Sequence, residues 1–236
     1  MPLTNHIIGT VFDITNLEAY YKLDNANDSS GNNRTLSAVG APTYTETGKY
    51  GKCLRLTNTE DPPRQYVYTT SPCNIDGGAI TMSFWHKLVT TSGSWRYLCV
   101  QQSSNTDTGY AIITYGTLQT FFTRTRVGVG NTNIKWEHDP LPTGVWFNLT
   151  LVYDTVTMYG YYNGKIVSTP ITASGNGTDP GIDQLVIGTD NYAAPTAQYM
   201  NANYDEVIVC SRAWSAQEVY QYYQGNKPTV NMGINY

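Results

Sequence analysis

Short stretches of alternating apolar and polar residues recur along the chain, with Gly, Asn, Asp, Pro and Ser between them. They are rich in β-branched and aromatic residues, a pattern typical of strands bounded by turns. The predicted strands span residues 53–57, 66–70, 80–88, 96–102, 110–116, 119–125, 134–138, 146–154, 158–164, 165–170, 184–189 and 204–210. Many short strands without a repeat period predict an all-β fold.

One stretch carries a strong turn signal, YYNGKIV at residues 161–167. Asn163 and Gly164 stand between two strand patterns, and an Asn-Gly pair favours the type I′ turn of a tight hairpin. We therefore expect the strands on either side of it to pair with each other.

SAQEVYQYYQG, residues 215–225, predicts a helix. Ser215 and Glu218 have the spacing of a capping box, and Gly225 supplies the stop. One short helix after a dozen strands predicts a two-layer antiparallel sandwich. We expect a single domain over residues 16–226, with an N-terminal extension (1–15) and a C-terminal tail (227–236).

The strand WFNLTLVYD, residues 146–154, shows which face each side chain takes. Alternate residues of a strand point to opposite sides of the sheet. One set is expected to fill the core between the sheets and the other to line an outer, often concave, face. The inward set is Leu149, Leu151 and Tyr153, and the outward set is Asn148, Thr150 and Val152.

Composition narrows the range of partners. The chain has 236 residues, 14 Lys+Arg, 18 Asp+Glu and a net charge of −4. Charged residues make up 14%, against about 25% in an average globular protein, and 20 tyrosines are present. Without a basic cluster, nucleic acid is not an expected partner, and no apolar run is long enough to insert into a membrane. The N-terminal MPLTNHIIGT lacks a secretory-signal pattern. The polar, Tyr-rich composition nevertheless favours an extracellular, cell-surface or virion location.

The cysteines form no CxxC pair, so neither a zinc site nor a redox motif is indicated. Each lies in or beside an apolar strand-like stretch, where a buried thiol behaves as a small hydrophobic group. Free thiols are predicted in preference to disulfides for Cys53, Cys73, Cys99 and Cys210.

Several stretches, in order, resemble the laminin-G-like domains of the concanavalin A-like lectin/glucanase superfamily. The similarity covers about residues 17–225, and no single motif is decisive. The matching stretches are LEAYYKLDNANDSSGNNRTLS, TGKYGKCLRL with QYVYT, ITMSFWHKL, GVWFNLTLVYD, MYGYYNGKIVST, LVIGTDN and NYDEVIVCSRAWSAQEVYQYYQ. The resemblance implies a jelly-roll sandwich.

The resemblance also implies a non-catalytic carbohydrate-binding or adhesion module, with a glycan or polysaccharide on the concave sheet or adjacent loops. Aromatic rings on such a surface stack against the C–H faces of sugars. An assembly domain of a virion, tail fibre or cell surface, with protein partners, is the alternative. Segments 127–133 and 174–183 are candidate rim loops. The candidate binding residues are Tyr97, Tyr110, Tyr115, Arg124, Trp136, Tyr159 and Tyr161.

A structural Ca²⁺ is a second implication, because related jelly rolls hold one between an Asp-rich first loop and a late strand. The matching positions are Asp28, the Asn33 carbonyl and Asp205, with Asp24 as an additional ligand. Carboxylates and carbonyls supply the oxygens that Ca²⁺ takes. The other interpretation is that Asp28 caps a turn and Asp205 pairs with Arg212.

Glycoside hydrolysis or polysaccharide lysis is a less favoured third reading. Hydrolysis needs two suitably spaced carboxyl groups. Glu137 and Asp139 share a face of one strand, but Leu141 occupies the third position of the array seen in retaining relatives. Asp205 and Glu206 would point to opposite faces of a regular strand. We therefore predict that the protein is not an enzyme.

Overall fold

The computed structural model describes residues 15–58, 64–69, 71, 73, 78–90, 95–102, 109–115, 118–126, 130–173, 184–189 and 199–227. The side chains of residues 95–102, 125, 126, 130 and 131 are not part of this description. Most of the predicted extension and tail, together with residues 127–129 and 174–183 of the predicted rim loops, lie outside the described residues.

Within these residues, nine strands form sheet A and seven form sheet B. Sheet A contains β1 (Leu17–Tyr21), β3 (Thr43–Thr47), β4 (Lys52–Leu56), β6 (Ile80–Leu88), β11 (Phe147–Tyr153), β12 (Thr157–Tyr162), β13 (Lys165–Ile166), β14 (Ile171–Thr172) and β16 (Ala202–Cys210). Sheet B contains β2 (Leu36–Val39), β5 (Tyr66–Thr69), β7 (Trp95–Gln102), β8 (Gly109–Tyr115), β9 (Gln119–Arg126), β10 (Gly130–Glu137) and β15 (Gln184–Ile187).

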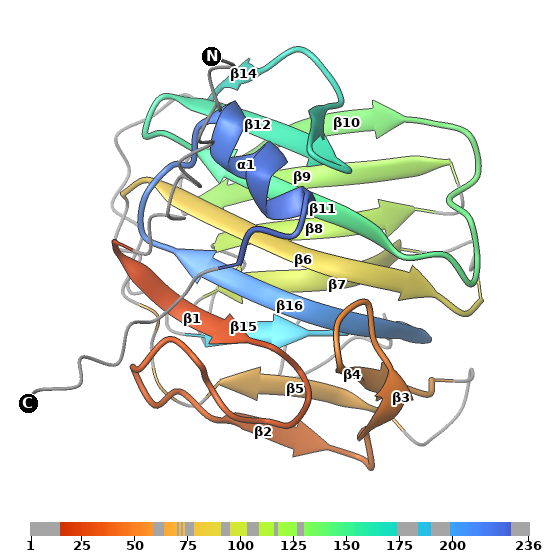
Figure 1. Cartoon of the computed structure of the whole chain (residues 1–236). Coiled ribbons are helices and arrows are strands. Elements are labelled where there is room, and N and C mark those ends of the chain that lie inside the picture. The colour runs from red at the N-terminus through yellow and green to blue at the C-terminus, as the bar shows by residue number, and fades with distance from the viewer. Residues whose placement is uncertain are drawn as a thin grey trace, which may run out of the picture.

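The two sheets lie face to face, and helix α1 (Ala216–Tyr223) lies across the side of sheet A that is turned away from sheet B (Figure 1). Sheet A runs β13-β12-β11-β6-β16-β4-β3, with β1 beside β16 and β14 beside β12, and sheet B runs β10-β9-β8-β7-β15-β5-β2. The strand pairs are antiparallel. The predicted all-β jelly-roll sandwich with one C-terminal helix is therefore confirmed.

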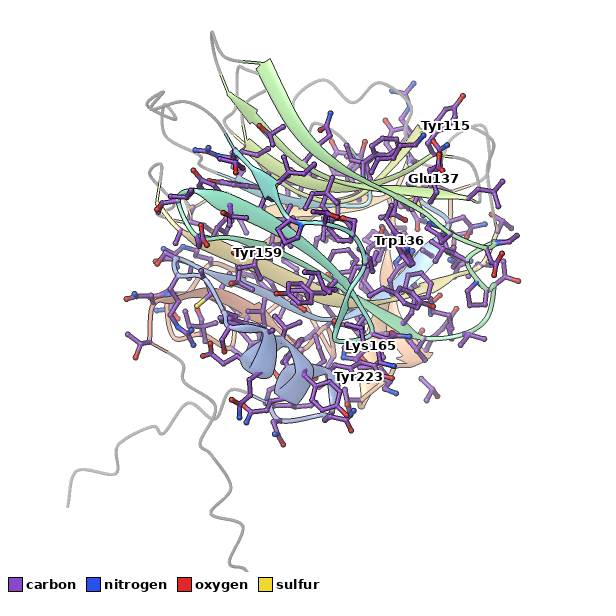
Figure 2. The ribbon with its side chains drawn as sticks, turned by 90° about the horizontal axis from the view of Figure 1, so that it is seen from above. Tyr115, Trp136, Glu137, Tyr159, Lys165 and Tyr223 are labelled. Carbon is purple, nitrogen blue, oxygen red and sulfur yellow. The ribbon has the colours of Figure 1, made fainter. Side chains whose placement is uncertain are left out.

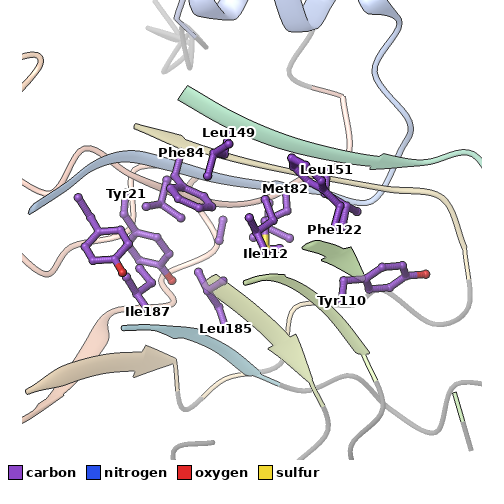
Figure 3. Packing of buried hydrophobic residues seen from close by; sticks show 14 of the residues in the cluster. Tyr21, Met82, Phe84, Tyr110, Ile112, Phe122, Leu149, Leu151, Leu185 and Ile187 are labelled. Atoms are coloured by element: carbon purple, nitrogen blue, oxygen red, sulfur yellow. The ribbon is translucent and has the colours of Figure 1, made fainter. Parts of the chain in front are cut away.

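Apolar side chains from both sheets interlock in the space between them (Figure 3). The predicted inward set of β11, Leu149, Leu151 and Tyr153, belongs to this core. Burying a side chain of this size contributes about 1.5–3 kcal/mol, so the shared core is what holds the two layers together.

The local signals for the hairpin and the helix are confirmed. Asn163 and Gly164 have φ values of 49° and 74°, as a type I′ turn requires, and β12 pairs with β13. Ser215 accepts a hydrogen bond from the Glu218 amide, and the Glu218 carboxylate accepts one from the Ser215 amide. The helix ends just before Gly225, whose φ is 95°.

The outer face of sheet A, meaning the face turned away from sheet B, is not open. The side chains of Asn148, Thr150 and Val152 point to this face as predicted, but all three are buried. A second apolar cluster forms there between the sheet and α1 (Figure 1). Its buried members are Tyr20, Val152, Tyr161, Ile208, Cys210, Trp214, Val219 and Tyr222. The expectation that this face is an exposed recognition surface is therefore wrong.

The cysteine prediction holds where the side chains are described. Cys53, Cys73 and Cys210 are buried free thiols. Burial raises the pKa of the Cys73 thiol to about 12, which keeps it protonated and unreactive. The side chain of Cys99 lies outside the described residues.

Candidate functional site

A groove of about 630 Å³ opens where the β12–β13 hairpin, the end of β10 and helix α1 meet. Figure 2 shows Trp136, Lys165 and Tyr223 from these three elements on the same side of the molecule. The described residues that line it are Trp136, Tyr162, Asn163, Lys165, Ile166, Val167, Tyr220, Tyr223 and Gln224.

Aromatic rings form much of the groove wall. The ring centroids of Tyr162 and Trp136 lie 4.9 Å apart, and those of Tyr220 and Tyr223 lie 6.3 Å apart. The ring of Tyr223 stacks on the ring of Trp85, with the two centroids 5.5 Å apart and an interplanar angle of 21°. This contact fixes the orientation of the Tyr223 ring. Tyr220 is 48% exposed, so a ligand can reach its ring. The rings are thus held in place before any ligand arrives.

The hairpin turn sets the position of the helix relative to the groove. The Asn163 amide donates to the Asn148 carbonyl at 2.9 Å, and its side-chain oxygen accepts from the Asn148 amide at 2.8 Å. A Cβ on Gly164 would lie 3.0 Å from the Cβ of Tyr223. Glycine therefore serves twice at this position, since it allows the positive φ and lets α1 approach the turn.

Polar groups along the groove are few. Asn163, Lys165 and Gln224 supply hydrogen-bonding side chains, and none of the described lining residues carries a carboxyl group. Apolar rings combined with a few polar groups are typical of sites for small ligands. The groove can therefore bind a flat, hydroxylated ring, but its described lining offers no acid for catalysis.

Trp136 is the only one of the predicted binding residues among the described residues that line the groove. Sequence reasoning missed Tyr162, Tyr220 and Tyr223. Two features of the sequence could have indicated them. One is the tight turn at residues 163–164, beside Tyr162, and the other is the tyrosine-rich helix that carries Tyr220 and Tyr223.

Three of the predicted binding residues are buried, so their expected position on an outer surface is wrong. Tyr110 and Arg124 lie between the sheets, and Arg124 donates to the hydroxyls of Tyr110 at 3.2 Å and Tyr153 at 3.0 Å. Tyr161 belongs to the cluster under α1. The strand assignments were right, but alternation alone did not separate the inward positions or reveal the helix covering the face.

The remaining candidates lie apart from the groove or are not described. Tyr115 is 42% exposed in β8 of sheet B and is not among the described residues that line the groove. Tyr159 is half-buried and donates its hydroxyl to Asp154 at 3.2 Å. The side chain of Tyr97 is not described, although its backbone pairs with Ile113 in sheet B.

Asp28 serves the first loop as a turn cap. Its carboxylate accepts hydrogen bonds from the amides of Tyr20 at 3.1 Å, Ser30 at 2.8 Å and Arg34 at 3.1 Å. It also accepts one from the Ser30 hydroxyl at 2.7 Å. Asn33 lies within this loop with a φ of 58°. The capping interpretation accounts for this part of the Asp-rich stretch.

Asp24 and Asp205 instead hold the turn at residues 48–52. Asp24 accepts from the Lys52 amide at 2.6 Å, and Asp205 accepts from the Tyr50 amide at 2.8 Å. Among the described residues no group of three or more His, Cys, Asp or Glu side chains is placed to hold a metal. Asp24, Asp28 and Asp205 thus form no three-carboxylate cluster, and the predicted ligand set of these residues with the Asn33 carbonyl stays a prediction. Arg212 pairs with Glu218 at 2.8 Å, so the alternative Asp205–Arg212 pair is wrong.

Calcium binding itself stays a prediction, with a direct test. A structural Ca²⁺ requires that EDTA lower the melting temperature and that added Ca²⁺ restore it. An ion at one hundred times its dissociation constant stabilises by about 2.7 kcal/mol, which corresponds to several degrees. Differential scanning calorimetry measures the shift, and Asp205→Ala should remove it. An unchanged melting curve in EDTA contradicts the prediction.

Neither of the two acidic pairs that the sequence suggested lies among the described residues that line the groove. Glu137 ends β10 and is ion-paired to Lys135 at 2.6 Å. A β-bulge at Glu206, with a φ of 51°, turns Asp205 and Glu206 toward the same face of sheet A, contrary to expectation. Both carboxyl groups are buried, and burial raises the pKa of Asp205 to about 8.

Glu206 is held by neighbours under α1. Tyr20 donates its hydroxyl to one carboxylate oxygen, and Lys227 pairs with the other at 2.5 Å. The Asp205–Glu206 pair therefore lies in the packed region beneath the helix and does not line the groove.

The family model of the concanavalin A-like lectin/glucanase superfamily matches residues 61–220, about two thirds of the chain. The chain therefore belongs to this superfamily, in its laminin G-type branch. No curated protein sequence matches it significantly.

Similar solved structures include binding domains of clostridial toxins. One is the binding domain of Paraclostridial Mosquitocidal Protein 1, with a TM-score of 0.71 and 14% identity over 90% of this chain and 52% of that one. Another is the binding domain of botulinum neurotoxin DC in complex with SialylT, with a TM-score of 0.70, 14% identity, and 91% and 52% coverage.

A third similar structure is from botulinum neurotoxin type C, whose cell entry depends on interaction with two ganglioside molecules. Its TM-score is 0.69, with 14% identity, 91% coverage of this chain and 52% of that one. The chain thus spans about half the length of these structures, and at this identity the likeness shows the fold.

Proposed function

We propose that the protein is a non-catalytic carbohydrate-binding module and that the groove beside α1 is its glycan site. The observation that carries the proposal is the wall of pre-positioned rings, Trp136, Tyr162, Tyr220 and Tyr223, beside the amide side chains of Asn163 and Gln224. Sugar rings stack on aromatic faces through their C–H bonds, while amide groups bind their hydroxyls.

Two further observations support this reading. The superfamily includes lectins, and two of the similar structures are from toxins that interact with SialylT or with ganglioside molecules. These toxin structures come from receptor-binding proteins, which agrees with action outside the cell or at a cell or virion surface. None of the helices in the described residues is long and apolar enough to cross a membrane.

A non-catalytic role is part of the proposal, because the superfamily also contains glucanases. Hydrolysis needs an acid and a second carboxylate on either side of the scissile bond. The described lining residues of the groove include neither. The corresponding measurement is release of reducing ends from a bound polysaccharide, which we expect to stay at background.

A protein partner is the second candidate function. Ile166 and Tyr220 are 51% and 48% exposed at the edge of the groove, and exposed apolar side chains are enriched in interfaces. An assembly domain would use this same edge against another structural protein. Retention of a glycan by the isolated chain distinguishes the two functions, because assembly alone does not require it.

Tyr220→Ala is expected to weaken glycan binding roughly threefold to tenfold, because it removes one stacking surface of about 0.5–1.5 kcal/mol. The ring is half-exposed, so the fold should be preserved. The measurement is the dissociation constant, by calorimetry, for the strongest ligand found on a glycan array.

Tyr115→Ala is the matched control, because Tyr115 is similarly exposed, at 42%, but is not among the described residues that line the groove. Its affinity should equal that of the unsubstituted protein. Equal affinities for all three proteins would place the glycan site elsewhere.

A further inference from the structure

We infer that the groove selects acidic glycans, with the carboxylate of the sugar facing Lys165. This inference rests on the proposed glycan site and adds the class of sugar. It is argued from the described lining of the groove, whose charged residue is a lysine although the whole chain has a net charge of −4.

Lys165 is the charged residue among the described lining of the groove. It follows the turn at residues 163–164, is exposed, and forms no ion pair with any carboxylate in the described part of the chain. An ammonium group beside aromatic walls, with no internal counter-ion, favours a ligand that brings a negative charge.

A second lysine extends this charge beyond Tyr223. Tyr223 stacks on Trp85, and the Lys49 ammonium lies 4.3 Å from the centre of the Trp85 ring. Lys49 is exposed, and like Lys165 it has no carboxylate partner among the described residues. Lys49 therefore adds an exposed cation on the Trp85 side of Tyr223, while Trp85 itself is buried between them.

The nearby acids do not cancel these charges. Glu206 is buried and pairs with Lys227, and Asp205 is buried and accepts a hydrogen bond from the Tyr50 amide. A ligand in the groove therefore meets Lys165 without meeting an acid among the described lining residues.

The test uses an array of paired probes, one acidic and one neutral. The pairs are polygalacturonate and its carboxyl-reduced form, a hyaluronan oligosaccharide and its carboxyl-reduced form, and sialyllactose and lactose. We expect the acidic member of a retained pair to bind more tightly. Lys165→Gln should lower its affinity roughly threefold to tenfold at low ionic strength and leave neutral glycans unchanged.

Lys135→Gln is the control variant, since Lys135 is also exposed but is not among the described lining residues and is ion-paired to Glu137 at 2.6 Å. Its affinity should stay unchanged. Equal binding of acidic and neutral probes, or an unchanged acidic preference in Lys165→Gln, overturns the inference while Tyr220→Ala still reports on the site. If the protein binds none of these probes and no glycan of a wider array, the proposed function is overturned as well.

Discussion

His86→Phe is expected to remove the loss of stability between pH 7 and pH 4.5 that arises from this residue; Asp205, whose raised pKa acts in the opposite direction, is present in both proteins and cancels in the comparison. His86 is fully buried between Phe84, Phe147 and Tyr204, and among the described residues neither of its ring nitrogens has a hydrogen-bond partner. Burial lowers the pKa of this imidazole from 6.5 to about 3.

The sign follows from proton linkage. Below pH 6.5 the unfolded chain takes up a proton at His86 and the folded protein does not, so stability falls as the pH falls toward 3. At pH 4.5 the loss from this residue is about 2–3 kcal/mol. Urea unfolding at pH 7 and pH 4.5 measures it, and the variant should lose that much less stability than the unsubstituted protein.

His138→Gln supplies the comparison. His138 is only half-buried, and its ring nitrogens lie 3.0 Å from the Thr120 hydroxyl and 2.6 Å from the Asp139 carbonyl. Burial lowers its pKa, while the contact with Asp139 acts in the opposite direction. Its replacement should change the acid response less than that of His86. The same response in His86→Phe and the unsubstituted protein would contradict the prediction.

Gly160→Ala is expected to destabilise the sandwich by about 2–3 kcal/mol, or roughly 5–10 °C in melting temperature. Gly160 lies in β12, opposite the fully buried ring of Phe122 from sheet B. A Cβ there would lie 2.5–2.9 Å from three ring atoms of Phe122, so the sheets would have to move apart or the ring would have to shift.

A double-mutant cycle separates this clash from other effects of removing a glycine. In the Phe122→Leu background, the same Gly160→Ala substitution should cost clearly less, because the ring is gone. Gly144→Ala is a control in open space, where a Cβ meets nothing within 4 Å and only the positive φ of 73° opposes it. Equal costs of Gly160→Ala in both backgrounds would show that the ring is not the cause.

The strands and the helix could be predicted from the sequence because their signals are local. The Asn163-Gly164 turn, the Ser215–Glu218 capping box and the alternation in β11 each act over a few residues. The pattern missed four of the described strands, β1, β2, β3 and β14, of which β2 and β3 lie at the ends of their sheets. β3 in particular is largely exposed, so it needs no apolar alternation and is held mainly by backbone pairing.

The covered face of sheet A could not be inferred from one strand at a time. Both β6 and β16 are buried along nearly their whole length, which is typical of strands with packing on both sides. Burial on both faces indicates that another element, here α1, covers the outer side of the sheet. Alternation within a single strand did not show this cover, so Tyr161 was assigned to an open surface.

The groove was hard to predict because its walls come from distant parts of the chain. Trp136, Tyr162 and Tyr223 belong to three different elements, and only the folded chain brings them together. The sequence identified Trp136 as a binding candidate from its residue type and strand. It could not show that the hairpin turn would pack against the helix.

The pairing of β1 with β16 also bears on how the protein is made. Tyr20 and Glu206 are 186 positions apart, yet they share a hydrogen bond, and β1 lies antiparallel to the end of β16. Sheet A therefore cannot be completed until residue 210 has emerged from the ribosome, and until then β1 lacks its partner strand β16. Contacts at such long range slow folding. The nascent chain meanwhile exposes an unpaired strand, which is prone to aggregation and is a typical target of chaperones.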